Sequence, residues 1–131
     1  MMKRRLLILL LLAVASMVSG CDDDPLAAFE PEIINDADAF QFQVTGAENV
    51  TVTRSYTWTN SLTRASIDHS TSRTGGSATV VVSDADGTEV YRSPMKASGT
   101  DPSEPGTAGD WTVQVIFTDF DGTANFRVEK L

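Results

Sequence analysis

Polar and apolar side chains alternate along most of the chain from residue 40 onward, and no stretch there has the apolar period of a helix. Successive side chains of a strand point to opposite faces, so this alternation predicts strands with one apolar and one polar face. The apolar sets are Phe40, Phe42 and Val44; Val50, Val52, Tyr56 and Trp58, with Arg54 among them; Ala65, Ile67 and His69; Ala78, Val80 and Val82; Val90 with Tyr91; Trp111, Val113, Val115 and Phe117; and Ala124, Phe126 and Val128.

These sets predict about seven short strands, rich in Val, Thr and aromatic residues. Each predicted sheet has one apolar face, and only a second sheet is available to cover it. The sequence therefore predicts an all-β chain whose residues 40–131 form a small antiparallel β-sandwich, either jelly-roll or immunoglobulin-like. The alternation does not specify the strand order.

Two similar segments punctuate the predicted strands. Asp84-Ala85-Asp86-Gly87 and Asp119-Phe120-Asp121-Gly122 both place Asp-Gly between apolar sets. Glycine supplies the positive φ of a tight turn without steric cost, so both segments are predicted to form hairpins. The segment from Ser93 to Asp110 is too long for a hairpin. It is predicted to be either a crossover between the two sheets or a functional loop.

Charge and composition exclude several classes of function. The 18 acidic and 10 basic side chains give a formal charge of −8, and no basic cluster lies outside the first five residues. Such a chain repels phosphate, so no nucleic-acid partner is expected. The chain has one histidine and one cysteine. It therefore cannot build a Cys/His zinc site or an internal disulfide from its own side chains.

The first twenty residues have the pattern of an export signal. Basic Lys3, Arg4 and Arg5 precede an apolar run from Leu6 to Val18. At 1.5 Å per residue a helix over this run reaches only about 20 Å, whereas the hydrocarbon core of a bilayer is about 30 Å thick. A signal peptide is therefore predicted rather than a permanent transmembrane helix.

The end of this segment, Val18-Ser19-Gly20-Cys21, resembles the lipobox of bacterial lipoproteins. The resemblance implies that residues 1–20 are a cleaved signal peptide and that the Cys21 thiol carries a diacylglyceryl group. It also implies a cell-envelope location and a membrane partner reached through the lipid on Cys21. Asp22, next to the cysteine, is similar to an inner-membrane retention signal of enteric bacteria, and the choice between inner and outer membrane stays open.

Residues 21–39, starting at the lipidated cysteine, are acidic, contain two prolines and have no sustained period. They are predicted to be a flexible spacer between the lipid and the domain. One alternative stays open within this segment, because Ile33 and Ile34 suit a first edge strand docked on the domain.

The sequence shows no defensible catalytic group. His69 lies between Asp68 and Ser70, but adjacent strand residues point to opposite faces, so neither neighbour can form a catalytic relay with the imidazole. His69 is expected to be a half-exposed strand residue. The aspartates of the predicted turns are expected to be solvated, where nothing raises a carboxyl pKa enough for general-acid chemistry. The chain is therefore predicted not to be an enzyme.

Two candidate ligand sites are nevertheless considered. Asp84, Asp86, Asp119 and Asp121 supply the hard oxygens that Ca²⁺ prefers, and they would share one ion if both hairpins met at the same end of the sandwich. Calcium is the only cofactor considered. Trp58 and Trp111 are expected in the core. Phe120, within a predicted turn, is the aromatic residue expected to be exposed and available to a sugar or peptide.

The stretch from Gly109-Asp110-Trp111 through Asp119-Phe120-Asp121-Gly122 into the last apolar set resembles the closing hairpin of P-type and pre-peptidase C-terminal jelly-roll domains. The resemblance implies a sandwich with an accessory, non-catalytic role. We therefore predict a lipid-anchored, non-enzymatic envelope lipoprotein that acts as an interaction or structural module, with an unknown envelope protein or glycan as partner. The alternative is a small calcium- or carbohydrate-binding module.

Overall fold

The computed structural model describes residues 24–131, and nearly all of its regular structure is β-strand. The described elements are the 3₁₀ turn η2 (Ala27–Phe29) and the strands β1 (Glu32–Asn35), β2 (Ala39–Asn60), β3 (Ala65–His69), β4 (Ser72–Ser83), β5 (Glu89–Pro94), β6 (Gly99–Pro102) and β7 (Gly109–Lys130). Every strand pair is antiparallel. The predicted all-β antiparallel fold is therefore confirmed. No helix within residues 24–131 is long and apolar enough to cross a membrane.

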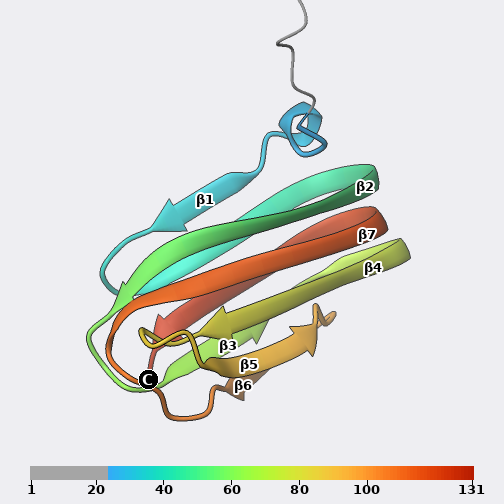
Figure 1. Ribbon diagram of the computed structural model, residues 1–131. Coiled ribbons are helices and arrows are strands. Elements are labelled where there is room, and N and C mark those ends of the chain that lie inside the picture. Colours follow the sequence, from blue (N-terminus) through green and yellow to red (C-terminus); the bar gives the residue numbers. More distant parts are fainter. Residues whose placement is uncertain (1–23) are drawn as a thin grey trace, which may run out of the picture.

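The sandwich forms because β2 and β7 are long enough to belong to both of its layers. Each has 22 residues, and the two strands pair with each other almost from end to end. Residues 39–44 of β2 and 124–129 of β7 lie in a layer ordered β1-β2-β7-β3-β6, called here the β6 layer. Residues 52–60 of β2 and 109–117 of β7 lie in a second layer, β2-β7-β4-β5, called the β5 layer. Figure 1 shows both long strands folding back on themselves at the right-hand end.

The fold-back depends on backbone conformations that glycine favours. The pairing register of β2 with β7 shifts three times between Val44 and Val52. Positive φ angles occur in the same region, at Gly46 and Asn49 in β2 and at Asp119 and Gly122 in β7. Extra residues in one strand of a pair bend it and increase its twist, so these bulges turn the ladder from one layer to the other.

The predicted hairpin at Asp119–Gly122 is consequently wrong. These residues lie inside β7, which runs unbroken from Gly109 to Lys130. Positive φ at Asp119 and Gly122 bends the strand without reversing it, because β2 follows the same bend alongside. The stretch that resembles a closing hairpin is therefore a single bent strand. The other prediction is confirmed: Asp84–Gly87 closes the β4–β5 hairpin, where the Gly87 N–H donates to Asp84 O at 3.0 Å.

The core lies between the two layers. Phe40, Phe42 and Phe126 of the β6 layer are each at most 1% exposed, and Phe42 and Phe126 stack at 5.8 Å between ring centroids. Trp58 and Trp111, on adjacent strands of the β5 layer, are fully buried and meet edge to face at 6.3 Å. Their prediction as core residues is confirmed.

The predicted flexible spacer is wrong for residues 24–39. Leu26 is only 1% exposed and belongs to the hydrophobic core. Phe29 packs against that core, and Arg54 of β2 forms an ion pair with Asp24. The alternative left open for Ile33 and Ile34 is confirmed, because both lie in β1, an edge strand paired with β2. Apolar contacts made by Leu26 and Phe29 therefore extend the domain back to Asp24.

The long segment from Ser93 to Asp110 is a crossover, as one of the two alternatives predicted. It leaves β5 in one layer, forms β6 at the edge of the other layer and returns to start β7. β6 was not predicted, because Gly99–Pro102 shows no alternating pattern. Its pairing with β3 is what makes it a strand.

A groove between the two sheet edges

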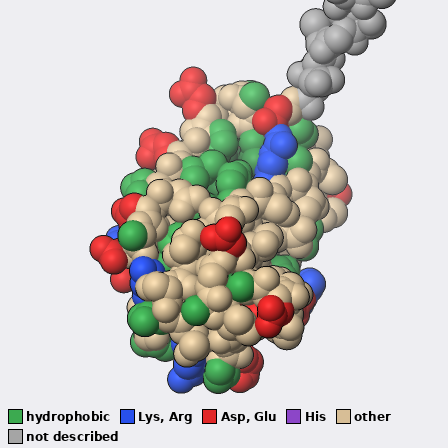
Figure 2. All heavy atoms as spheres, turned by 60° about the vertical axis from the view of Figure 1, so that its left-hand side comes forward, with side chains coloured by type: hydrophobic (Ala, Val, Ile, Leu, Met, Phe, Trp, Pro, Cys, Tyr) green, Lys and Arg blue, Asp and Glu red, His purple; other side chains and the backbone are tan. Residues whose placement is uncertain are grey.

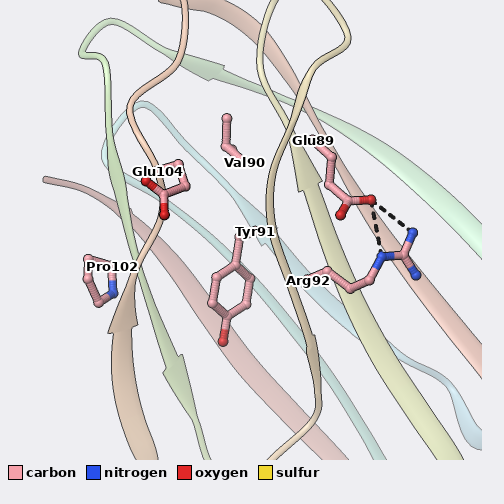
Figure 3. Close-up of a pocket in the computed structure, with 6 residues that line it drawn as sticks. All are labelled: Glu89, Val90, Tyr91, Arg92, Pro102 and Glu104. Atoms are coloured by element: carbon pink, nitrogen blue, oxygen red, sulfur yellow. Dashed lines mark hydrogen bonds and ion pairs between the residues drawn. The ribbon is translucent and has the colours of Figure 1, made fainter.

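A groove of about 360 Å³ opens where the edge strands β5 and β6 of the two layers face each other. Figure 3 shows Tyr91 between its two walls, with Arg92 and Glu89 on one side and Pro102 and Glu104 on the other. Val90 completes the lining. The groove therefore lies at one edge of the sandwich, between its two layers.

One wall is organised by an ion pair on β5. Arg92 Nε and Nη2 both donate to Glu89 Oε1, at 3.1 and 2.9 Å. This hydrogen bond holds the pKa of the Glu89 carboxyl below its ordinary value. Glu89 Oε2 and Arg92 Nη1 take no part in these two bonds, so each side chain keeps hydrogen-bonding capacity. Figure 3 shows the paired ends of both side chains at the rim of the groove, directed away from Tyr91.

The opposite wall is fixed to both layers by backbone hydrogen bonds. The Glu104 N–H donates to Val90 O of the β5 layer at 2.8 Å, and the Ser103 N–H donates to Ala65 O of the β6 layer at 2.7 Å. Buried Ser103 also accepts the Ala65 N–H through its hydroxyl at 2.9 Å. The Pro102–Glu104 wall is thus held in place without a ligand.

Tyr91 is held between the layers by three polar side chains behind the groove. Its hydroxyl lies 2.7 Å from His69 Nε2 and donates to Asp101 Oδ2 at 2.6 Å. Lys96 Nζ donates to the same carboxylate oxygen at 2.6 Å. Burial raises the pKa of the Tyr91 phenol, and the bond to Asp101 adds to the rise. The hydrogen bonds from Lys96 and Tyr91 lower the pKa of Asp101. The ring is therefore a fixed, neutral, half-buried surface.

His69 is buried rather than half-exposed, so that prediction is wrong. Only 3% of the residue is accessible, because Tyr91 of β5 and the backbone at Lys96 both contact its ring. Its Nδ1 accepts the Lys96 backbone N–H at 3.2 Å, which places the ring proton on Nε2, facing Tyr91. Burial lowers the pKa of the imidazole. The neighbours Asp68 and Ser70 are exposed, and Asp68 bonds to Thr100 instead.

The predicted four-aspartate calcium site does not form. Asp84 and Asp86 lie at the hairpin next to Ser83, which pairs with Thr112, whereas Asp119 and Asp121 lie seven and nine residues further along β7, at the bend. The two pairs occupy opposite ends of the β5 layer. No group of three or more His, Cys, Asp or Glu side chains suited to a metal occurs within residues 24–131.

Asp84 instead anchors the crossover. Its Oδ1 accepts the N–H groups of Asp86 and Thr88, and its Oδ2 accepts that of Thr107 at 2.9 Å. These bonds, with that from Thr107 the largest, lower the pKa of Asp84. The carboxylate is therefore occupied by backbone donors of its own chain.

Phe120 is also not the predicted exposed aromatic. It is fully buried and packs on Phe117 at 5.0 Å between ring centroids. The prediction is wrong because a turn would expose this ring, whereas the bend of β7 directs it into the core. The aromatic residue that reaches a groove is Tyr91, which the alternation grouped with the core. Nothing in the local sequence distinguishes an apolar position on a central strand from one at a sheet edge.

The lipidation prediction for Cys21 lies outside the described residues, which begin at Asp24. It therefore stays a prediction.

No protein-family model matches the chain, and no curated protein matches it by sequence. Solved structures are similar at low identity. The Aeromonas hydrophila PliG, a periplasmic inhibitor of g-type lysozyme, matches with 14% identity and a TM-score of 0.45, covering 71% of this chain and 86% of that one.

Two carbohydrate-binding modules match to a similar degree. TmCBM61, solved with β-1,4-galactotriose, has 12% identity and a TM-score of 0.44 over 77% of this chain and 70% of that one. The module CBM6cm-2 of Cellvibrio mixtus lichenase 5A, solved with cellotriose, has 13% identity and a TM-score of 0.45 over 80% and 88%. These values indicate a distant likeness. The groove is defined by contacts within this chain alone.

Proposed function

We propose that this protein is a lipid-anchored, non-enzymatic binding module of the bacterial cell envelope, and that it binds an uncharged glycan segment in the β5–β6 groove. The observation that carries the proposal is the Tyr91 ring, fixed between the Arg92–Glu89 pair and the Pro102–Glu104 wall. An amphipathic ring with charged side chains on either side of it suits a ligand with apolar C–H faces and many hydroxyls.

The charges of the groove support an uncharged ligand. Glu89 and Glu104 are balanced only by Arg92, and residues 24–131 contain 16 acidic against seven basic side chains. A phosphate or carboxylate group would approach against this charge. Vicinal hydroxyls, in contrast, donate to carboxylates and accept from a guanidinium.

A binding role is favoured over catalysis by the state of the ionisable groups. Glu89 and Asp101 have lowered pKa values, whereas a general acid needs a raised one. Both nitrogens of the buried His69 imidazole are already hydrogen-bonded. None of these three groups is positioned as a proton donor to a ligand in the groove.

The lipid anchor is proposed on the lipobox resemblance ending at Cys21. An acidic body is repelled by anionic headgroups, so its surface supplies no electrostatic attraction to the membrane. Acyl chains supply about 0.8 kcal/mol per buried CH₂ and need no help from the surface. The proposed location is therefore the bacterial envelope, on either membrane.

Calorimetric titration of the full chain with neutral cello-, xylo-, galacto- and chito-oligosaccharides tests the binding proposal. We expect one class to bind, and Arg92→Ala to weaken that binding about tenfold, which corresponds to about 1.4 kcal/mol. Arg127→Ala is the matched control, because Arg127 forms an equally exposed ion pair with Glu129 on the β6 layer, away from the groove. Absence of binding at millimolar sugar, or an equal loss in both variants, would overturn the proposal.

A further inference from the structure

We infer that the anchored protein holds its β1–β2 edge next to the bilayer and presents the β5–β6 groove on the side away from it. The ligand is then a glycan polymer beyond the domain, rather than the headgroup of a glycolipid in the same membrane. This inference rests on the proposed lipid anchor.

Only a short length of chain is available between the lipid and the domain. Asp24 is already held by its ion pair with Arg54, and its Oδ1 accepts the Leu26 N–H at 3.0 Å. Leu26 itself is in the core. Only Asp22 and Asp23 separate Cys21 from Asp24. Three residue steps span at most about 10 Å, so the lipid attachment point lies within that distance of Asp24.

Asp24 lies at the edge of the sandwich opposite the groove. Its partner Arg54 lies in β2, the outermost strand of the β5 layer on that side, and β1 is the outermost strand of the β6 layer. β5 and β6 are the outermost strands on the opposite side. Figure 1 shows η2 and β1 at the top and β5 and β6 at the bottom. The chain therefore enters at one edge, and the groove opens at the other.

The width of the sandwich exceeds the length of this connection. Three strand spacings separate β2 from β5, and four separate β1 from β6, which amounts to about 14 to 19 Å. A connection of about 10 Å is shorter than this width. The domain can tilt on its attachment, but it cannot roll the groove onto the membrane that holds it.

The groove side offers little electrostatic attraction to lipid, because Arg92 is the only basic residue in its lining and lies beside Glu89 and Glu104. Acidic side chains are distributed over the face shown in Figure 2, and no large basic patch gathers on it. The membrane-side edge exposes Ile33 and Ile34, at 41% and 53%. Chain length, rather than electrostatic attraction, sets the orientation.

Fluorescence quenching in reconstituted vesicles tests the inference. The full chain, acylated in a bacterial host, is placed in phosphatidylethanolamine vesicles containing headgroup spin-labelled lipid. Ile34→Cys and Glu104→Cys each provide one free thiol for a fluorophore, because the natural cysteine is blocked by the lipid. We expect quenching several-fold stronger at position 34 than at position 104.

A control variant carries a flexible Gly/Ser insert of about 20 residues between Asp23 and Asp24, whose average reach of about 25 Å should remove the difference. Mass spectrometry of Cys21 separates the two possible failures. Acylated protein with equal quenching at both positions overturns the orientation and leaves the anchor standing. An unmodified Cys21 overturns the anchor, and the orientation with it, while glycan binding is measured independently.

Discussion

Both nitrogens of the His69 ring are already hydrogen-bonded, and this fixes how the residue responds to acid. A protonated ring would direct an Nδ1–H at the Lys96 N–H, which is itself a donor. Burial lowers the pKa of the native imidazole, whereas the unfolded residue titrates near its ordinary value of about 6.5. Below that pH the unfolded chain therefore binds a proton that the native chain does not.

We predict that the free energy of unfolding falls as the pH is lowered from 7 toward 5, by up to about 1.4 kcal/mol per pH unit. Urea unfolding at a series of pH values measures this slope. His69→Gln removes the only histidine of the chain while retaining a donor and an acceptor, and its profile should be flatter over the same range. An unchanged slope in His69→Gln would assign the acid sensitivity to other groups. Asp101, with its lowered pKa, adds a separate loss only below about pH 4.

At the scale of the strand, the bend between the layers depends on close backbone approach as well as on positive φ. Gly122 has φ 141°, and a Cβ there would lie 2.1 Å from Ser72 O of β4. Gly46, in the corresponding bend of β2, has φ 62° and open space around it. The two glycines therefore separate the conformational cost of a side chain from the steric one.

We predict that Gly46→Ala costs about 1 kcal/mol of stability, the conformational cost of a left-handed alanine. Gly122→Ala should cost about 3 kcal/mol or more, because β4 must also move away from β7. Thermal or urea unfolding of the two variants, side by side, measures the difference. Equal costs would show that β4 moves aside freely at the bend.

At the scale of the whole molecule, the folded domain includes residues 24–39 and does not start near residue 40. Leu26 reaches the core from a turn that precedes every strand, and it is as buried as the central phenylalanines. A flexible spacer has no such contact. The burial of Leu26 therefore distinguishes a folded N-terminal segment from a flexible one.

We predict that Leu26→Ala destabilises the protein by about 2 to 5 kcal/mol, the usual cost of truncating a buried leucine. Leu62→Ala is the control, because Leu62 is 46% exposed and its loss should cost less than about 0.5 kcal/mol. Calorimetric melting of both variants tests the prediction. If Leu26→Ala melted at the same temperature as the control, residues 24–30 would be a flexible spacer rather than a part of the folded domain.

The alternation of polar and apolar residues was sufficient to predict the strand class, the sandwich and most of the core, because the side-chain period of a strand is a local property of the chain. The two Asp-x-Asp-Gly segments show where local information ends. Both permit positive φ, yet one closes the β4–β5 hairpin and the other bends β7. The outcome depends on β2, which accompanies β7 through its bend and lies far away in sequence.

Which aromatic residue lines the groove likewise depends on the tertiary structure alone. The sequence groups Tyr91 with an apolar set and places Phe120 in an exposed turn, and the structure contradicts both expectations. Tyr91 reaches solvent because β5 is the last strand of its layer, and Phe120 is buried because β7 is a central one. Burial depends on which strands lie on either side, and strand order is set by pairings between distant segments, which a local pattern does not contain.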